Sequence, residues 1–309
     1  MGSHHHHDIH HMGHMPDRPS PSPALAKASI ANLGWSAAQA AAGLALGSTA
    51  LLSDSVHNLG DATGLVLAWI AANLSRRRAT HIRTWGLHRT GQLAGFANAV
   101  LVLVGAAAVG IGAIWRLAHP IAVDGLQVSL WALGGIAVNV LSAWWIGSRN
   151  VGINARGAYL HLVSDAAISA AVVVGGLAVH FSGLAWIDPL LALGISLWLL
   201  AHTWPFFRET LDTILDAVPL RHDPSRIQSD LAGIEGVESL HDLHIWPLGD
   251  SRTALSVHLV HRDQTDPTEI LRKALDKLHH EHPDIHATIQ VEPSGTETWH
   301  GHEVCPGRE

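Results

Sequence analysis

Two short segments of the chain each contain a histidine followed four residues later by an aspartate. The first pair is His57 and Asp61, within SDSVHNLGDATG, and the second is His161 and Asp165, within YLHLVSDAAIS. On an α-helix, side chains four positions apart lie on the same face, about one turn apart. Two imidazoles and two carboxylates make a plausible tetrahedral ligand set for Zn²⁺. The four residues are therefore candidate ligands of one metal ion.

Both pairs fall inside apolar stretches that are long enough to cross a bilayer. Ionisable side chains are costly there, so they mark a functional site by default. A lone histidine in an apolar helix is more often a packed residue with one hydrogen bond, and a lone aspartate is more often a cap or a partner of arginine. No Lys or Arg lies in the body of either helix. The buried carboxylates therefore need a different partner, and we expect a bound cation.

The charge of these four side chains suggests a mechanism. Two aspartates and two neutral histidines give a charge of −2, which in a low dielectric favours uptake of either M²⁺ or protons. Metal binding requires neutral imidazole and ionised carboxylate, so it expels protons. A site that opens alternately to each side would then be a metal/proton antiporter. Nitrogen ligands favour Zn²⁺ over Mg²⁺ or Ca²⁺ but do not separate Zn²⁺ from Cd²⁺, Co²⁺ or Ni²⁺.

Six apolar segments supply the elements that must position these residues. The chain of 309 residues is 48% hydrophobic and 15% charged, against about 25% charged in an average soluble domain. Each segment is near the ~20 residues that a spanning helix needs. Most Lys and Arg residues lie at one side of the predicted spans, so both termini are expected to be cytoplasmic. The predicted segments run over about 26–46, 50–74, 93–115, 126–146, 158–179 and 187–207.

The composition becomes that of a soluble domain after about residue 208. Helix, strand and turn signals predict the order α-β-β-α-β, with the helices on one face of a small open sheet. We therefore predict four parts. They are a His-rich flexible tail, a six-helix transmembrane domain, a cytoplasmic domain and a flexible His/Cys tail, over 1–24, 25–208, 209–295 and 296–309. The first tail fits either an expression tag or a native metal-collecting segment.

The chain resembles the cation diffusion facilitator family, in its zinc-transporting branch. GSTALLSDSVHNLGDATGL resembles the second-helix motif of that family, and NARGAYLHLVSDAAIS resembles its fifth-helix motif. IDPLLALGISLWLL resembles the sixth helix, while HDLHIWPL, SVHL and TIQVEP resemble the cytoplasmic domain. The resemblance implies an α-helical membrane protein with six transmembrane helices, a ferredoxin-like C-terminal domain and a homodimer. It also implies export of zinc from the cytoplasm in exchange for protons, across the inner (plasma) membrane.

The resemblance also implies further sites. His241, His258 and Glu292 match positions that bind cytoplasmic zinc. Cys305, in the His/Cys tail, either completes such a site or belongs to an unliganded tail.

Another match concerns the link between the two domains. Arg89 resembles a basic residue that pairs with an acid after the sixth helix, here Asp216, although a plain charged surface is an equal alternative. Asp54, near the first His/Asp pair, is interpreted as a helix-end cap together with Ser53; the alternative is a residue that supports the metal ligands or lines the ion pathway.

The expected partners are the lipid bilayer, a second copy of the chain and protons, with no nucleic acid. Zn²⁺ is expected both as substrate and as a structural or regulatory ion, with Cd²⁺ or Co²⁺ as alternative substrates. We do not expect an enzyme, because a catalytic zinc usually keeps an open position and a nearby general base. A membrane-embedded sensor or metalloenzyme without transport is the alternative.

Overall fold

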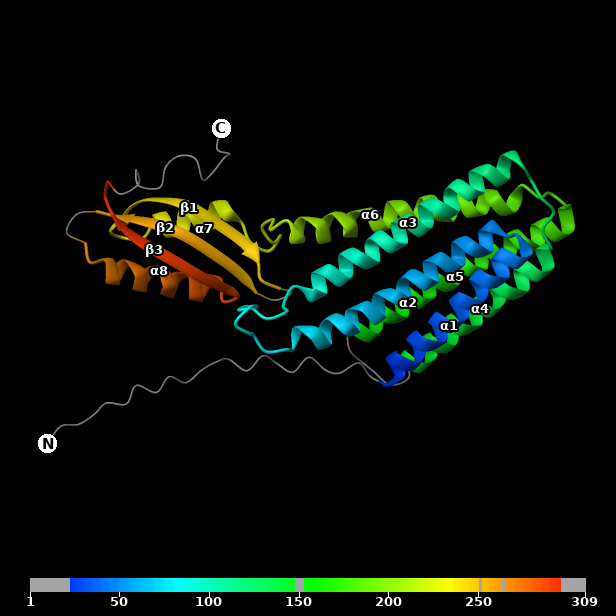
Figure 1. Ribbon diagram of the computed structural model, residues 1–309, viewed down its shortest axis with the longest axis horizontal. Coiled ribbons are helices and arrows are strands. Elements are labelled where there is room, and N and C mark those ends of the chain that lie inside the picture. Colours follow the sequence, from blue (N-terminus) through cyan, green and yellow to red (C-terminus); the bar gives the residue numbers. More distant parts are fainter. Residues whose placement is uncertain (1–22, 148–152, 250–251, 263–264, 296–309) are drawn as a thin grey trace.

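The computed structural model describes residues 23–147, 153–249, 252–262 and 265–295. Figure 1 shows two parts along the long axis of the molecule, a bundle of long helices and a small domain with a sheet. The bundle consists of six helices of 23 to 30 residues. They are α1 (Pro23–Leu46), α2 (Thr49–Ser75), α3 (Thr90–Ala118), α4 (Gly125–Gly147), α5 (Ile153–Ser182) and α6 (Ile187–Ile214).

The bundle is built from two groups of helices. The pairs α4–α5, α1–α2 and α1–α4 are in contact, while α3 packs along α6 to one side of them (Figure 1). In the described part of the chain, four helices are long and apolar enough to cross a membrane, and these belong to α3, α4, α5 and α6. The sequence predicted six spans, two more than meet this criterion. Buried polar residues, among them Asp54, His57 and Asn58, line α2 and make that helix less apolar overall.

The sixth helix is longer than the sequence indicated. The sixth apolar segment was predicted to end near residue 207, but α6 continues to Ile214. Residues 209–214 contain no Gly or Pro that would end a helix. The helix stops just before Asp216, whose positive φ of 62° turns the chain toward the small domain.

The small domain has the predicted order of elements. These are α7 (Pro224–Ala232), β1 (Val237–Pro247), β2 (Thr253–His261), α8 (Pro267–Glu281) and β3 (Ile285–Pro293). The strand order is β1-β2-β3, with β1 antiparallel and β3 parallel to β2. Leu255, Val257 and Leu259 point from β2 into a core that includes Ile227 of α7 and Ile270 of α8. The opposite face of the sheet is therefore free of helix and carries the alternate residues of each strand.

A buried aspartate joins the start of α2 to the start of α6. Asp188 is 4% exposed, and its Oδ2 accepts hydrogen bonds from the backbone and hydroxyl of Thr49 at 2.7 and 2.8 Å. Ser48, the N-cap of α2, donates to the other carboxylate oxygen. The carboxylate therefore satisfies donors at the positive end of the α2 dipole.

We predict that Asp188→Asn destabilises the bundle by about 1–3 kcal/mol, because it removes the charge and leaves one buried donor poorly matched. Thermal unfolding of the detergent-solubilised chain measures this. Asp124→Asn is the matched control, because Asp124 caps α4 at an exposed position and Asn caps equally well. Equal effects of the two changes would contradict the role of Asp188.

Candidate metal centre

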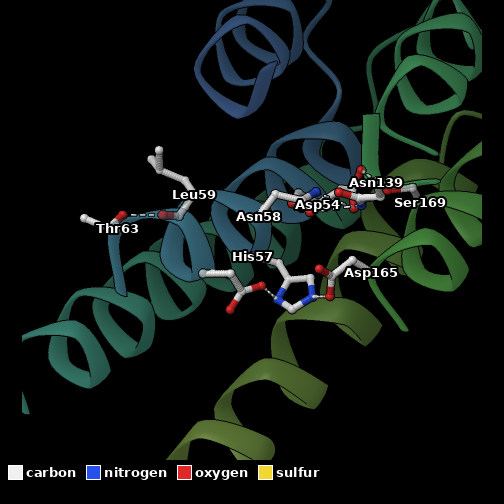
Figure 2. A network of polar contacts seen from close by, with 9 residues as sticks. Asp54, His57, Asn58, Leu59, Thr63, Asn139, Asp165 and Ser169 are labelled. Carbon is white, nitrogen blue, oxygen red and sulfur yellow. Dashed lines mark hydrogen bonds and ion pairs between the residues drawn. The ribbon is translucent and has the colours of Figure 1, made fainter. Parts of the chain in front are cut away.

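Three candidate ligands of the first site converge between α2 and α5. Figure 2 shows His57 of α2 facing Asp165 of α5, and the distance from Nε2 to Oδ1 is 3.1 Å. The other ring nitrogen of His57, Nδ1, lies 3.4 Å from Oδ2 of Asp61, one turn further along α2. One ligand atom from each of the three residues falls within 4.8 Å of the others. His57 is 6% and Asp165 3% exposed, whereas the Asp61 side chain is 30% exposed, so two of the three ligands are buried and Asp61 is partly exposed.

The fourth candidate, His161, belongs to α5 one turn before Asp165. Its side chain lies outside the described residues. The helical backbone places its position on the same face of α5 as Asp165, so its assignment as a ligand stays a prediction.

The position of His57 between two carboxylates limits what the cluster can hold. A neutral imidazole has one donor nitrogen and one acceptor nitrogen, whereas an imidazolium has two donors. Both nitrogens of His57 face carboxylate oxygens, an arrangement that suits the doubly protonated ring. A divalent ion held by these same three groups would require the protons to leave. Protons and a metal ion would thus compete for the same atoms.

Asp54 is not a helix-end cap, and that interpretation was wrong. Ser48 caps α2, whereas Asp54 lies inside the helix with 0% exposure. Its carboxylate accepts hydrogen bonds from Gln39 of α1 at 2.6 Å and from Ser169 of α5 at 3.0 Å. Asn58, one turn along α2, adds a third donor at 3.3 Å (Figure 2). Neutral donors from three helices therefore hold this charge beside the cluster.

Two features of this network could not be identified from the sequence. Gln39 and Ser169 are polar residues in apolar helices, and only their meeting at Asp54 reveals their role. Asn139 of α4 extends the network, since its amide lies 3.5 Å from Oδ1 of Asn58.

An aromatic residue of α6 borders the same cluster. Trp198 meets the ring of His57 edge to face, with ring centroids 5.7 Å apart. His202, one turn further along α6, stacks on Trp198 with centroids 5.1 Å apart. The cluster thus has a wall contributed by α6 in addition to the two helices that bear the ligands.

A second cluster lies on the helix-free face of the sheet. His241 and His258 are cross-strand partners on β1 and β2, with ring centroids 4.9 Å apart. Glu292 of β3 contacts His258 at 2.8 Å and His241 at 3.4 Å. Burial alone would raise the pKa of Glu292, but the neighbouring imidazoles of His258 and His241 lower it below its usual value. The three residues predicted to bind metal here are therefore adjacent.

Asp242 joins this second cluster although the sequence did not indicate it. A register shift in β1 between His241 and His244 accompanies a positive φ of 51° at Asp242. The bulge lets Asp242 and His241 point to the same side, and the carboxylate lies 3.4 Å from Nδ1 of His241. Strict alternation along a strand predicts the opposite. His244 is exposed beyond the bulge, and Cys305 lies outside the described residues.

The expected interdomain contact has a defined geometry. Arg89, at the start of α3, forms an ion pair with Asp216 and donates a hydrogen bond to the carbonyl of Pro247 at 3.1 Å. Both side chains of the ion pair are about half exposed, at 45% and 52%. A pair exposed to this extent contributes about 0–1 kcal/mol.

A buried His/Asp cluster between helices of an apolar bundle is typical of membrane proteins that bind and move cations. Comparison with known families agrees. Residues 25–215 match the cation efflux transmembrane domain, and residues 219–294 match the cytoplasmic domain of cation efflux proteins. The chain belongs to the cation efflux (cation diffusion facilitator) family, as the sequence motifs indicated, and is an integral membrane protein.

Several characterised proteins are similar over most of their length. The metal cation efflux system protein CzcD of Cupriavidus metallidurans is 32% identical, over 91% of this chain and 90% of that protein. The cadmium, cobalt and zinc/H(+)-K(+) antiporter of Bacillus subtilis is 32% identical, over 91% and 92%. The zinc transporter ZitB of Escherichia coli is 30% identical, over 84% and 83%. These relatives are transporters, not enzymes.

We predict that Ser169→Ala lowers the stability of the bundle by about 1 kcal/mol or more, because it removes a donor from the buried Asp54 carboxylate. Thermal unfolding in detergent measures the change. Ser182→Ala is the control, because Ser182 is exposed and bonds only within its own helix end. Unchanged stability of Ser169→Ala would contradict the assigned role of the network.

Proposed function

We propose that the chain exports Zn²⁺ from the cytoplasm in exchange for H⁺ by alternating access. The observation that supports this best is His57, which lies between the carboxylates of Asp61 and Asp165. With His161, these residues form the proposed transport site. The relatives named as a zinc transporter and as a cadmium, cobalt and zinc/H(+)-K(+) antiporter favour the same activity, with Cd²⁺ and Co²⁺ as alternative substrates.

The exchange follows from the chemistry of the ligands. In the proton-bearing state, an imidazolium at His57 neutralises part of the charge of the two carboxylates. When Zn²⁺ enters, it takes the lone pairs of imidazole and carboxylate, and the protons leave. Each state is closer to neutral than the empty, deprotonated site, which is costly in the bilayer. The protein therefore passes between its two orientations with either zinc or protons bound.

The proposed architecture places all six long helices across the bilayer. The transmembrane domain covers residues 25–208 and the ferredoxin-like cytoplasmic domain residues 209–295, between tails at 1–24 and 296–309. Both termini lie in the cytoplasm in this proposal, since Lys and Arg gather on one side of the spans. The membrane is the inner (plasma) membrane, as the family resemblance implies. The active unit is a homodimer in this proposal.

The cluster on the sheet has a separate role in this proposal. His241, His258 and Glu292 bind cytoplasmic zinc as a structural or regulatory ion, and Cys305 is a further candidate ligand. The Arg89–Asp216 pair then fixes the orientation of the cytoplasmic domain relative to the transmembrane domain. A sensor without transport would use the same cytoplasmic cluster, and a metalloenzyme would need an open coordination position. A four-residue transport site leaves none.

We predict that Asp165→Asn abolishes zinc-driven proton flux in proteoliposomes, because the amide can neither bind Zn²⁺ as an anion nor release a proton. A pH-sensitive dye inside the vesicles records the flux after zinc is added. Asp124→Asn serves as the matched control, since Asp124 is an exposed carboxylate that caps α4. It should transport like the unmodified chain.

Two outcomes would contradict the proposal. Persistent flux in Asp165→Asn would remove Asp165 from the transport site. Zinc binding by the unmodified chain without any flux would favour the sensor.

A further inference from the structure

A third group of potential ligands lies on the helix side of the cytoplasmic domain, across the sheet from His258. Asp230 belongs to α7, Glu281 is the last residue of α8, and His282 follows it as the C-cap. One ligand atom of each lies within 4.8 Å of the others. Oδ2 of Asp230 and Nε2 of His282 are both buried without a hydrogen-bond partner. Such unsatisfied atoms are rare in folded proteins and call for an explanation.

His222 supplies an independent observation at the same place. It lies in the connection from α6 to α7, its side chain is 3% exposed, and its ring lies 5.4 Å from that of His282. Nε2 of His222 contacts Oδ2 of Asp284 at 3.0 Å. Nε2 also lies 3.3 Å from Nε of Arg221, but the contact to the carboxylate is the shorter one. A proton on Nε2 makes that contact a hydrogen bond and leaves a lone pair on Nδ1. Nδ1 is buried and has no partner.

This arrangement is the carboxylate–histidine unit that orients metal-binding imidazoles. The carboxylate of Asp284 also accepts a hydrogen bond from Arg221 at 2.7 Å, which holds it in place. We propose that His222, Asp230, Glu281 and His282 form a further divalent-metal site between α7, α8 and the connection from α6. Two imidazoles and two carboxylates suit Zn²⁺.

Two cations lie beside the proposed ligands and compete with a metal. Nε of Arg226 lies 3.9 Å from Oδ2 of Asp230, too far for a hydrogen bond, and its guanidinium lies 3.9 Å from Glu281. Lys277 lies 3.4 Å from Oδ1 of Asp230. These contacts are long, and the Arg226 side chain is 70% exposed, so it can move into solvent at little cost. Lys277 also bonds to the backbone carbonyl of Asp230 and can remain there. A bound ion would therefore displace Arg226 first.

The location suggests what the site would do. The connection between α6 and α7 carries His222, and α6 extends from the transmembrane bundle (Figure 1). A metal that binds His222 together with α7 and α8 would clamp this connection to the cytoplasmic domain. Cytoplasmic zinc would thereby act on a segment that continues directly into a membrane helix.

Zinc stoichiometry of the full-length chain in detergent tests the proposal. The background carries Asp165→Ala and His258→Ala, which weaken the other two clusters, and equilibrium dialysis counts bound Zn²⁺. Adding His282→Ala should remove one zinc per chain. His279→Ala is the control, because His279 is exposed on the same helix and should leave the count unchanged. Thermal unfolding verifies that each variant is folded, and Glu281→Gln replaces His282→Ala if that variant does not fold.

A further variant separates a metal site from a plain cluster of ion pairs. Arg226→Ala removes a competing cation, so the proposal predicts tighter zinc binding at this site. A pure ion-pair cluster predicts lower stability and unchanged zinc binding. Equal zinc counts for His282→Ala and His279→Ala, or no change in affinity with Arg226→Ala, would overturn the proposal.

Discussion

The bundle must hold several carboxylates in an apolar environment without basic side chains. No Lys or Arg occurs at positions 28–75, 117–148 or 157–207, which include most of α1, α2, α4, α5 and α6. Asp54 and Asp188 are held by neutral donors, which are amide and hydroxyl groups for Asp54 and backbone and hydroxyl groups for Asp188. Asp61 and Asp165 instead face an imidazole. Asp54 and Asp188 thus have partners that stay neutral, whereas the partner of Asp61 and Asp165 is an imidazole that can gain or lose a proton.

This separation explains how the proposed transport site is supported. The Asp54 network links α1, α2 and α5 one turn from His57, so the helices that bear the ligands share a polar anchor. Asp188 ties the start of α2 to α6. Beyond the bundle, Arg89 pairs with Asp216 after α6 and bonds to the carbonyl of Pro247 in the small domain. Arg221, in the following chain, pairs with Asp284 of the small domain. The hydrogen bonds of Asp54 and Asp188 therefore hold the helices in place around the proposed transport site. Within that site, protons and a metal ion can replace one another.

The sequence predicted those features that depend on local spacing. The i, i+4 pairing of His57 with Asp61 follows from helical geometry, and the α-β-β-α-β order follows from periodicity and caps. The features that it missed depend on distant residues or on irregular backbone. Asp54 resembled a cap because its partners, Gln39 and Ser169, lie on other helices. Asp242 joins its cluster only through a β-bulge, which breaks the alternation that strand patterns assume.

The central claim is that zinc and protons compete for His57, Asp61 and Asp165. Titration calorimetry of zinc binding, repeated in buffers with different ionisation enthalpies, counts the protons released per zinc. The difference between the unmodified chain and the Asp165→Ala variant isolates this site from the cytoplasmic clusters. The account predicts release of at least about one proton per zinc at this site near neutral pH, where imidazole titrates. Zinc binding at this site without any proton release between about pH 6 and pH 8 would contradict it.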